Sequence, residues 1–220
     1  MKHFRTSLLL SLFGLCGSAC LGPAPTSAPG DPTVLLRSSA GDELGVATDH
    51  GVLFLNRGGQ RGWIDLTAWF SDGASWEEGR VQPLGGGLFA TQPEIRLATA
   101  ALSFDEPGRG DAVLVRGRRG YASWETTTEV ATHPSVDGLL LRLNDRLRRM
   151  DDTEIGAGVY VGPDADQRLI GLVSGRLLLE TSEGEREYLT VVGTRDLWRA
   201  VLRERERGDR APFVYREDIL

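Results

Sequence analysis

Residues 153–179 constrain most strongly what this chain can fold into, because they carry two short apolar runs around a turn. The runs at 159–161 and 169–174 are rich in valine, isoleucine and leucine, and the turn at 162–167 holds glycine, proline and aspartate. Such a pattern predicts two antiparallel strands joined as a β-hairpin. The glycine-rich sequence GAG at 156–158 directly precedes the first of these strands.

Short apolar runs that end at turn signals recur along the whole chain. The 220 residues are 40% hydrophobic and include 28 glycines, which favours an all-β protein with one globular unit of one or two subdomains. A helix is predicted at 195–207, with Thr194 as its cap. Further strands are predicted at 33–38, 44–48, 52–55, 63–70, 80–84, 93–102, 112–116, 121–132, 138–143 and 187–192.

Residues 1–19 have the features of a secretory signal. A basic start precedes an apolar run at 8–15 that is too short to span a bilayer comfortably. Small residues then precede Cys20. This pattern resembles the lipobox of bacterial lipoproteins, and the resemblance implies lipidation of that cysteine. Gly17 departs from the leucine usual at its position, so an ordinary cleaved signal with a chance cysteine stays open. The sequence from 20 to 32, rich in proline, alanine, serine and glycine, predicts a flexible tether.

The residue inventory excludes several chemistries. Beyond Cys20 the chain has no cysteine and no lysine, which removes thiol nucleophiles, cysteine metal sites, disulfides within the chain and serine–lysine dyads. His50 and His133 are the histidines left for serine–histidine catalysis. No HExxH, GxxxxGK[ST] or strand-linked GxGxxG motif occurs, so we expect neither a metal site nor a cofactor. The net charge of −6 makes nucleic acid an unfavourable partner.

The order of these elements resembles that of trypsin-like serine peptidases, in which a glycine-rich turn carries the nucleophilic serine and a hairpin with a GLVSG-like strand follows. Here the turn TEIGAG places Ile155 at the position of the serine, and the sequence LFLNRGG places Gly58 at that of the histidine. The sequence EIRLA places Glu94 at that of the aspartate. The resemblance implies an all-β, two-barrel architecture with a C-terminal helix, with a first barrel at 33–105 and a second at 106–220.

With all three catalytic positions changed, the resemblance implies a degenerate domain without peptidase activity and without catalytic residues. In the family, the glycine-rich turn and the loop before it form an oxyanion hole, and a strand matching Val173, Ser174 and Gly175 pairs with an extended peptide. Capture of a peptide by a strand edge needs only main-chain groups, so it can survive the loss of catalysis. We therefore expect an inactive domain of the bacterial cell envelope, periplasmic or at the cell surface, held to the membrane by its lipid and binding a protein or peptide.

Two other functions stay open. The first is an active hydrolase that combines His50 or His133 with an unanticipated serine. The second is an unrelated β-sandwich or small-barrel lipoprotein with a structural role, which would have no cleft between Gly58 and Ile155. Three tryptophans close in sequence, at 63, 69 and 76, allow a carbohydrate-stacking surface, although packing in the core is the commoner role of tryptophan.

Overall fold

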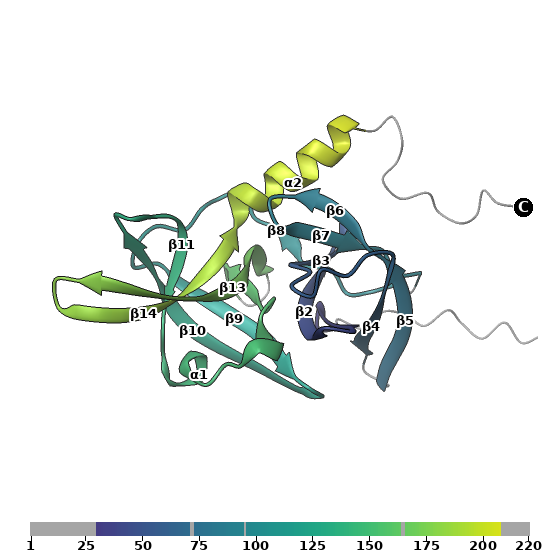
Figure 1. Cartoon of the computed structure of the whole chain (residues 1–220), viewed down its shortest axis with the longest axis horizontal. Coiled ribbons are helices and arrows are strands. Elements are labelled where there is room, and N and C mark those ends of the chain that lie inside the picture. Colours follow the sequence, from purple (N-terminus) through teal and green to yellow (C-terminus); the bar gives the residue numbers. More distant parts are fainter. Residues whose placement is uncertain (1–29, 71–72, 95, 164–165, 208–220) are drawn as a thin grey trace, which may run out of the picture.

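The structure, a computed structural model, describes residues 30–70, 73–94, 96–163 and 166–207. Two β-sheets lie side by side, and a helix near the end of the chain lies along the top of both (Figure 1). The predicted all-β class with a C-terminal helix is confirmed. Neither helix in the described part of the chain combines the length and the apolar character that crossing a bilayer requires. The predicted signal at 1–19 and Cys20 lie outside the described residues.

The first sheet has the antiparallel order β5-β4-β1-β2-β3-β7-β6. Alternate residues of β4, namely Ile64, Leu66 and Ala68, are buried in its core, as the apolar–polar alternation of a half-buried strand requires. Its strands are β1 (Thr33–Ser38), β2 (Gly41–Thr48), β3 (Gly51–Phe54), β4 (Trp63–Phe70), β5 (Gly73–Arg80), β6 (Gln82–Gly85) and β7 (Leu88–Thr91).

The first sheet is a half-barrel, because its two edge strands, β5 and β6, do not pair with each other. It nevertheless curls strongly enough to bring β5 against β7. A Cβ atom at Gly79 of β5 would come within 2.0 Å of the Thr91 hydroxyl, so only glycine fits this approach. The expectation of two barrels is therefore met by one closed barrel and one open one.

The second sheet forms the closed six-stranded barrel β12-β9-β10-β11-β14-β13, sealed by pairing between β12 and β13. These two strands are the hairpin predicted at 159–161 and 169–174, with Val159 opposite Gly171. The barrel strands are β9 (Ala112–Arg119), β10 (Ala122–His133), β11 (Val136–Arg142), β12 (Gly158–Val161), β13 (Arg168–Thr181) and β14 (Gly184–Gly193).

One sequence-based strand is wrong for most of its length. Of the predicted strand at 93–102, only β8 (Ala101–Leu102) pairs, and it does so in parallel with β13 of the second sheet. The second sheet thus begins before residue 105. The strand beside β3 is β7, which was not predicted because its four residues follow three glycines and are too few to show a period.

The two sheets share a core that the C-terminal helix covers. Helix α2 (Thr194–Arg207) buries Leu197, Ala200 and Val201 against residues of both sheets, including Leu84 of β6 and Leu172 of β13. The Thr194 hydroxyl donates a hydrogen bond to the Ile170 carbonyl at 3.0 Å, so it ties the helix to β13 rather than serving as the predicted cap.

The last residues of the predicted tether are bound to the folded part. Asp31 forms an ion pair of 2.9 Å with Arg118 of β9 and accepts a hydrogen bond from the Thr33 N–H at 3.0 Å. The Arg118 guanidinium lies 4.1 Å above the ring of Trp69 on β4. Because Arg118 and Asp31 are both largely buried, these contacts join the start of the domain to both sheets.

Candidate functional site

The turn that matches the nucleophile position is built by a capping box. Asp151 caps the short 3₁₀ helix η1 (Asp152–Glu154), its side chain accepting from the Thr153 N–H at 3.0 Å. The Glu154 carboxylate returns to accept the Asp151 N–H at 3.0 Å. Hydrogen bonds from Thr153 lower the pKa of Asp151, so its carboxylate stays ionised and keeps the cap.

Ile155, at the position matching the serine, is buried with 6% of its surface exposed. Its carbonyl accepts a hydrogen bond of 2.9 Å from the Leu44 N–H of β2, which joins the turn to the first sheet. Gly156 then adopts φ +93, and a Cβ atom there would lie 1.8 Å from the Leu44 carbonyl oxygen. The turn therefore presents an apolar side chain inward, where the family presents a nucleophile.

Every main-chain N–H from residue 153 to residue 157 already donates within the fold. The acceptors are the Asp151 carboxylate and the carbonyls of Asp151, Asp152, Val173 and Glu154, in chain order of the donors. An oxyanion hole needs N–H groups that point together at an external oxygen. In this structure the turn at 153–157 offers no such free N–H group.

Glu154 is a fully buried carboxylate held by two arginines. Arg119 of β9 donates to it at 2.5 Å, and Arg146 of helix α1 (Asp145–Arg148) pairs with its other oxygen. The hydrogen bond to Glu154 raises the pKa of Arg119. Arg146 also lies 3.9 Å above the ring of Trp124. Because burying a carboxylate without partners is costly, these contacts hold the loop and the turn in one arrangement.

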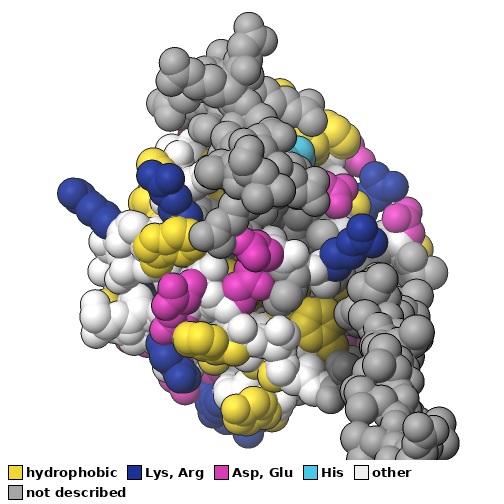
Figure 2. Space-filling model, turned by 90° about the vertical axis from the view of Figure 1, so that its right-hand side faces the viewer, with side chains coloured by type: hydrophobic (Ala, Val, Ile, Leu, Met, Phe, Trp, Pro, Cys, Tyr) yellow, Lys and Arg dark blue, Asp and Glu magenta, His cyan; other side chains and the backbone are white. Residues whose placement is uncertain are grey.

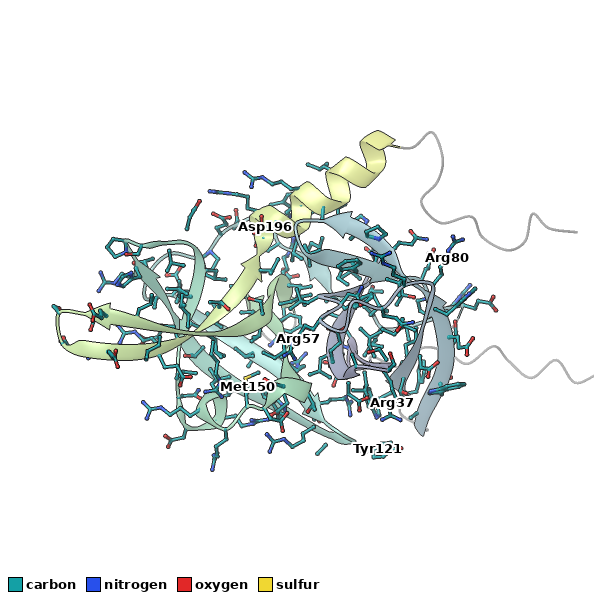
Figure 3. All side chains as sticks on the ribbon, in the orientation of Figure 1. Arg37, Arg57, Arg80, Tyr121, Met150 and Asp196 are labelled. Carbon is teal, nitrogen blue, oxygen red and sulfur yellow. The ribbon has the colours of Figure 1, made fainter. Side chains whose placement is uncertain are left out.

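Gly58, at the position matching the histidine, lies on the surface beside the β1–β2 turn. A Cβ atom there would come 2.7 Å from the Ser38 hydroxyl, so a larger side chain would displace that turn. Its neighbour Arg57 reaches the nucleophile turn instead. The Arg57 guanidinium donates to the Asp152 carbonyl at 2.6 Å, and Figure 3 shows Arg57 between the two sheets. Arg57 thus joins the loop that contains Gly58 to the turn that contains Ile155.

Glu43 lies buried next to this bridge, and its carboxylate accepts the Arg57 N–H at 3.3 Å. Desolvation raises the pKa of Glu43, although Arg57 opposes this effect. The folded protein therefore holds the proton of Glu43 more tightly than the unfolded chain, and ionisation of this group costs stability.

Replacing Glu43 by glutamine is expected to raise the melting temperature at pH 7 by about 1–3 °C. The gain arises because glutamine keeps an acceptor for Arg57 without a buried charge. As pH falls through the raised pKa, the wild-type carboxyl becomes protonated in the folded state and the difference disappears. Thermal melts from pH 4 to pH 8, with the exposed Glu185→Gln as the control, measure this. A difference that stays constant with pH would contradict it.

Glu94, at the position matching the aspartate, follows β7 on the surface and lies outside any strand. Its main-chain N–H donates to the carboxylate of Glu77 on β5, the far edge of the first sheet. Nothing in these contacts brings Glu94 together with Gly58 and Ile155.

Neither histidine lies at the nucleophile turn. His50 sits in the β2–β3 turn with its ring edge-on to Trp198, at 6.2 Å between ring centres. It lies beyond the end of β2, about 13 Å or more along that strand from Leu44, the residue bonded to Ile155. His133 ends β10, where its ring contacts the Glu180 carbonyl at 2.9 Å and accepts the Ser135 N–H.

The three residues predicted to bind a peptide, Val173, Ser174 and Gly175, have different surroundings in the structure. The Val173 N–H donates to the Ala157 carbonyl and its carbonyl accepts from Gly156, so neither group can bind a peptide. Ser174 and Gly175 lie at a bulge where β13 leaves β12, and from there to Thr181 β14 is the strand paired with β13 in the described structure. Ser174 and Gly175 therefore begin a strand edge, whereas Val173 belongs to the closed barrel.

Sequence reasoning missed the arginines that occupy this region. Arg176 of β13 donates to the carbonyls of Leu147, Arg148 and Met150 at 2.8–3.0 Å, at the carboxyl end of α1. Like Arg57, Arg176 does not belong to any recognisable sequence motif. Only its position, two residues after Ser174, could have drawn attention to it.

Two surface hollows lie away from the turn at 153–157. One, of about 390 Å³, is lined by residues such as Glu106 and Val161, and another, of about 330 Å³, lies between the β10–β11 hairpin and the start of α2. Within the described ranges, no group of three or more histidine, cysteine, aspartate or glutamate side chains could hold a metal ion.

Comparison with solved structures identifies proteins of the same fold. A human astrovirus serine protease matches with a TM-score of 0.53 at 17% identity, over 77% of this chain and 93% of that one. The MamO protease domain from Magnetospirillum magneticum matches with 0.52 at 16%, over 79% and 96%. An inactive form of the Rv3671c protease matches with 0.51 at 16%, over 82% and 92%. No family model and no curated protein sequence matches the chain. At these identities the likeness shows a shared fold.

Proposed function

We propose that this chain, which has the two-barrel fold of trypsin-like serine proteases, is a catalytically inactive member of that fold. Its role is to hold an extended segment of a partner protein at the bacterial cell envelope. The observation that carries the proposal is the state of the turn at 153–157. Ile155 is buried there, and every N–H of the turn is already bonded within the fold.

This geometry argues against an active enzyme more strongly than a missing serine does. Acyl transfer needs a nucleophile, a base and oxyanion donors that point at one substrate carbonyl. The turn at 153–157 supplies no free N–H donors. Arg57, next to the position that matches the base, is bonded to the Asp152 carbonyl, and Glu94 contacts Glu77 on the edge strand β5. A hydrolase that used His133 as its base would need a free ring nitrogen, but Nε2 contacts the Glu180 carbonyl at 2.9 Å and Nδ1 accepts the Ser135 N–H at 3.2 Å.

The edge of β13 from Ser174 to Thr181 is the proposed binding site. An edge strand offers a row of main-chain donors and acceptors to which an extended segment can add as a further strand. Leu178 on this edge has 58% of its surface exposed, an apolar contact for an alternate side chain of the partner. Lipidation at Cys20 would hold this edge near the membrane, with the residues before Asp31 as the spacer.

A photo-reactive amino acid at position 178 of the full chain, expressed in its source organism, tests the proposal. We expect a cross-link to one partner, and mass spectrometry should place the linked residue in an extended segment. The same substitution at Leu202 of α2, which is 49% exposed, is the matched control and should give no adduct with that partner. The purified protein should also leave a serine-directed fluorophosphonate unreacted.

If the partner cross-links equally to positions 178 and 202, or does not cross-link to position 178, the proposal that the β13 edge binds a partner is wrong. Labelling by the fluorophosphonate that is lost in His50→Ala or His133→Ala would instead establish an active hydrolase.

A further inference from the structure

The structure separates the three tryptophans near the start of the chain into two kinds. Trp69 is half-buried and carries the Arg118 guanidinium on its ring, so it has a structural role. Trp63 and Trp76 have 57% and 61% of their surfaces exposed. Neither of these two is needed for the core of the first sheet, which Ile64, Leu66 and their neighbours fill from the other face.

The register of β4 and β5 places both exposed tryptophans on one face. Trp63 lies opposite Arg80, and Trp76 lies opposite Thr67. Because residues at alternate positions share a face, Trp63 and Trp76 both point outward, four positions apart or roughly 14 Å. Both belong to the outer hairpin of the half-barrel, where β5 has an unpaired edge in the described sheet.

Two carboxylates stand midway between the indoles. Asp65 lies opposite Glu78 on the same outward face, two positions from Trp63 on one side and two from Trp76 on the other. Along the strands this face carries one indole, then the two carboxylates, then the second indole. Arg80 lies beside Trp63, and Arg37 of β1, which is paired with Asp42, lies beside Asp65. Figure 2 shows this side of the molecule, where hydrophobic side chains stand apart with acidic and basic side chains among them.

We propose that this face, defined by Trp63, Asp65, Glu78 and Trp76, binds a linear polysaccharide of neutral or amino sugars. Each pyranose ring has an apolar face of C–H groups that can stack on an indole, and hydroxyls around its rim. The carboxylates accept hydrogen bonds from hydroxyl and amino groups. The spacing of the indoles lets one oligosaccharide contact both while it crosses the carboxylate pair.

Other ligands match this face less well. Nucleic acid bases also stack on tryptophan, but the carboxylates and the net charge of −6 repel phosphates. The same charges disfavour acidic polysaccharides. A protein interface has a contiguous apolar centre, whereas here a charged row separates the two indoles. The site does not depend on the β13 edge, so either proposal can fail alone.

Calorimetric titration of the full chain, in a detergent without a sugar headgroup, with chitohexaose and cellohexaose tests the site. We expect saturable binding to at least one, weakened about tenfold by Trp63→Ala or Trp76→Ala. Asp65→Asn with Glu78→Gln should also weaken it. Because all four side chains face outward, melting temperatures should stay close to wild type. Phe104→Ala removes another exposed aromatic ring, which lies against Trp198 of α2, and should leave binding unchanged.

The proposal is overturned if neither sugar binds, if both tryptophan variants bind like wild type, or if Phe104→Ala weakens binding equally. Binding of a heparin oligosaccharide in preference to both sugars would overturn the stated ligand class. Binding of a proline-rich peptide with no response to sugars would assign the same indoles to a protein partner instead.

Discussion

Replacing Gly156 by alanine is expected to lower the free energy of unfolding by about 3–5 kcal/mol. Gly156 has φ +93, which alanine adopts only with strain, and the added Cβ atom would lie 1.8 Å from the Leu44 carbonyl oxygen. To relieve that clash the turn must move away from β2. The movement would break the hydrogen bond from the Leu44 N–H to Ile155 and loosen the contact between the two sheets.

Urea unfolding at pH 7 measures this change, and Gly175→Ala is its matched control. Gly175 lies on the neighbouring strand β13, its φ is not positive, and an added Cβ atom would meet only the Thr190 hydroxyl at 3.6 Å. We expect the control to change stability by less than about 1 kcal/mol. If the two variants unfold at the same urea concentration, the turn does not depend on the close approach to β2.

Glutamine in place of Glu154 is expected to lower the free energy of unfolding by about 2–4 kcal/mol. Glu154 is fully buried and binds two arginines while it closes the capping box with Asp151. Glutamine keeps the volume but presents N–H groups to Arg119 or Arg146, so at least one charged hydrogen bond is lost. The loop from α1 to the turn would then loosen together with the pairing of Arg146 over Trp124.

Asp152→Asn is the control for this substitution. Asp152 is next but one to Glu154 and its side chain is 92% exposed, so neutralising it should change stability by no more than about 0.5 kcal/mol. Amide hydrogen exchange of residues 151–157 adds a local readout, because loss of the Glu154 contacts should release the Asp151 N–H first. Equal stability of the two variants would show that the buried charge contributes nothing.

Local patterns in the sequence were enough to predict most strands. The alternation WIDLTAWF predicts β4 to the residue, and the turn at 162–167 predicts the hairpin of β12 and β13. Strands β5 and β7 were not predicted, and of the strand predicted at 93–102 only β8 formed. Strands β7 and β8 are held by partners far away in the chain, β3 and β13, and have too few residues to show a period.

The candidate site shows the same division. That the positions matching a catalytic triad hold Gly58, Glu94 and Ile155 can be read from the sequence by counting from motifs. Counting fails for Glu94, because the strand expected to carry it does not form. Counting also cannot show that both main-chain groups of Val173 are hydrogen-bonded inside the barrel, whereas Ser174 begins the edge of β13.

By itself the sequence determined an all-β chain, no thiol or lysine chemistry beyond residue 20, and no serine in the turn at 153–158. These properties follow from composition and from contacts between near neighbours. Only the tertiary structure decided that the turn's N–H groups are all bonded, that Arg57 bridges the two sheets, and which tryptophans face solvent. The bond from the Gly156 N–H to Val173, the Arg57 bridge and the partial burial of Trp69 under Arg118 depend on segments that meet across long sequence separations, where packing and register select the partner.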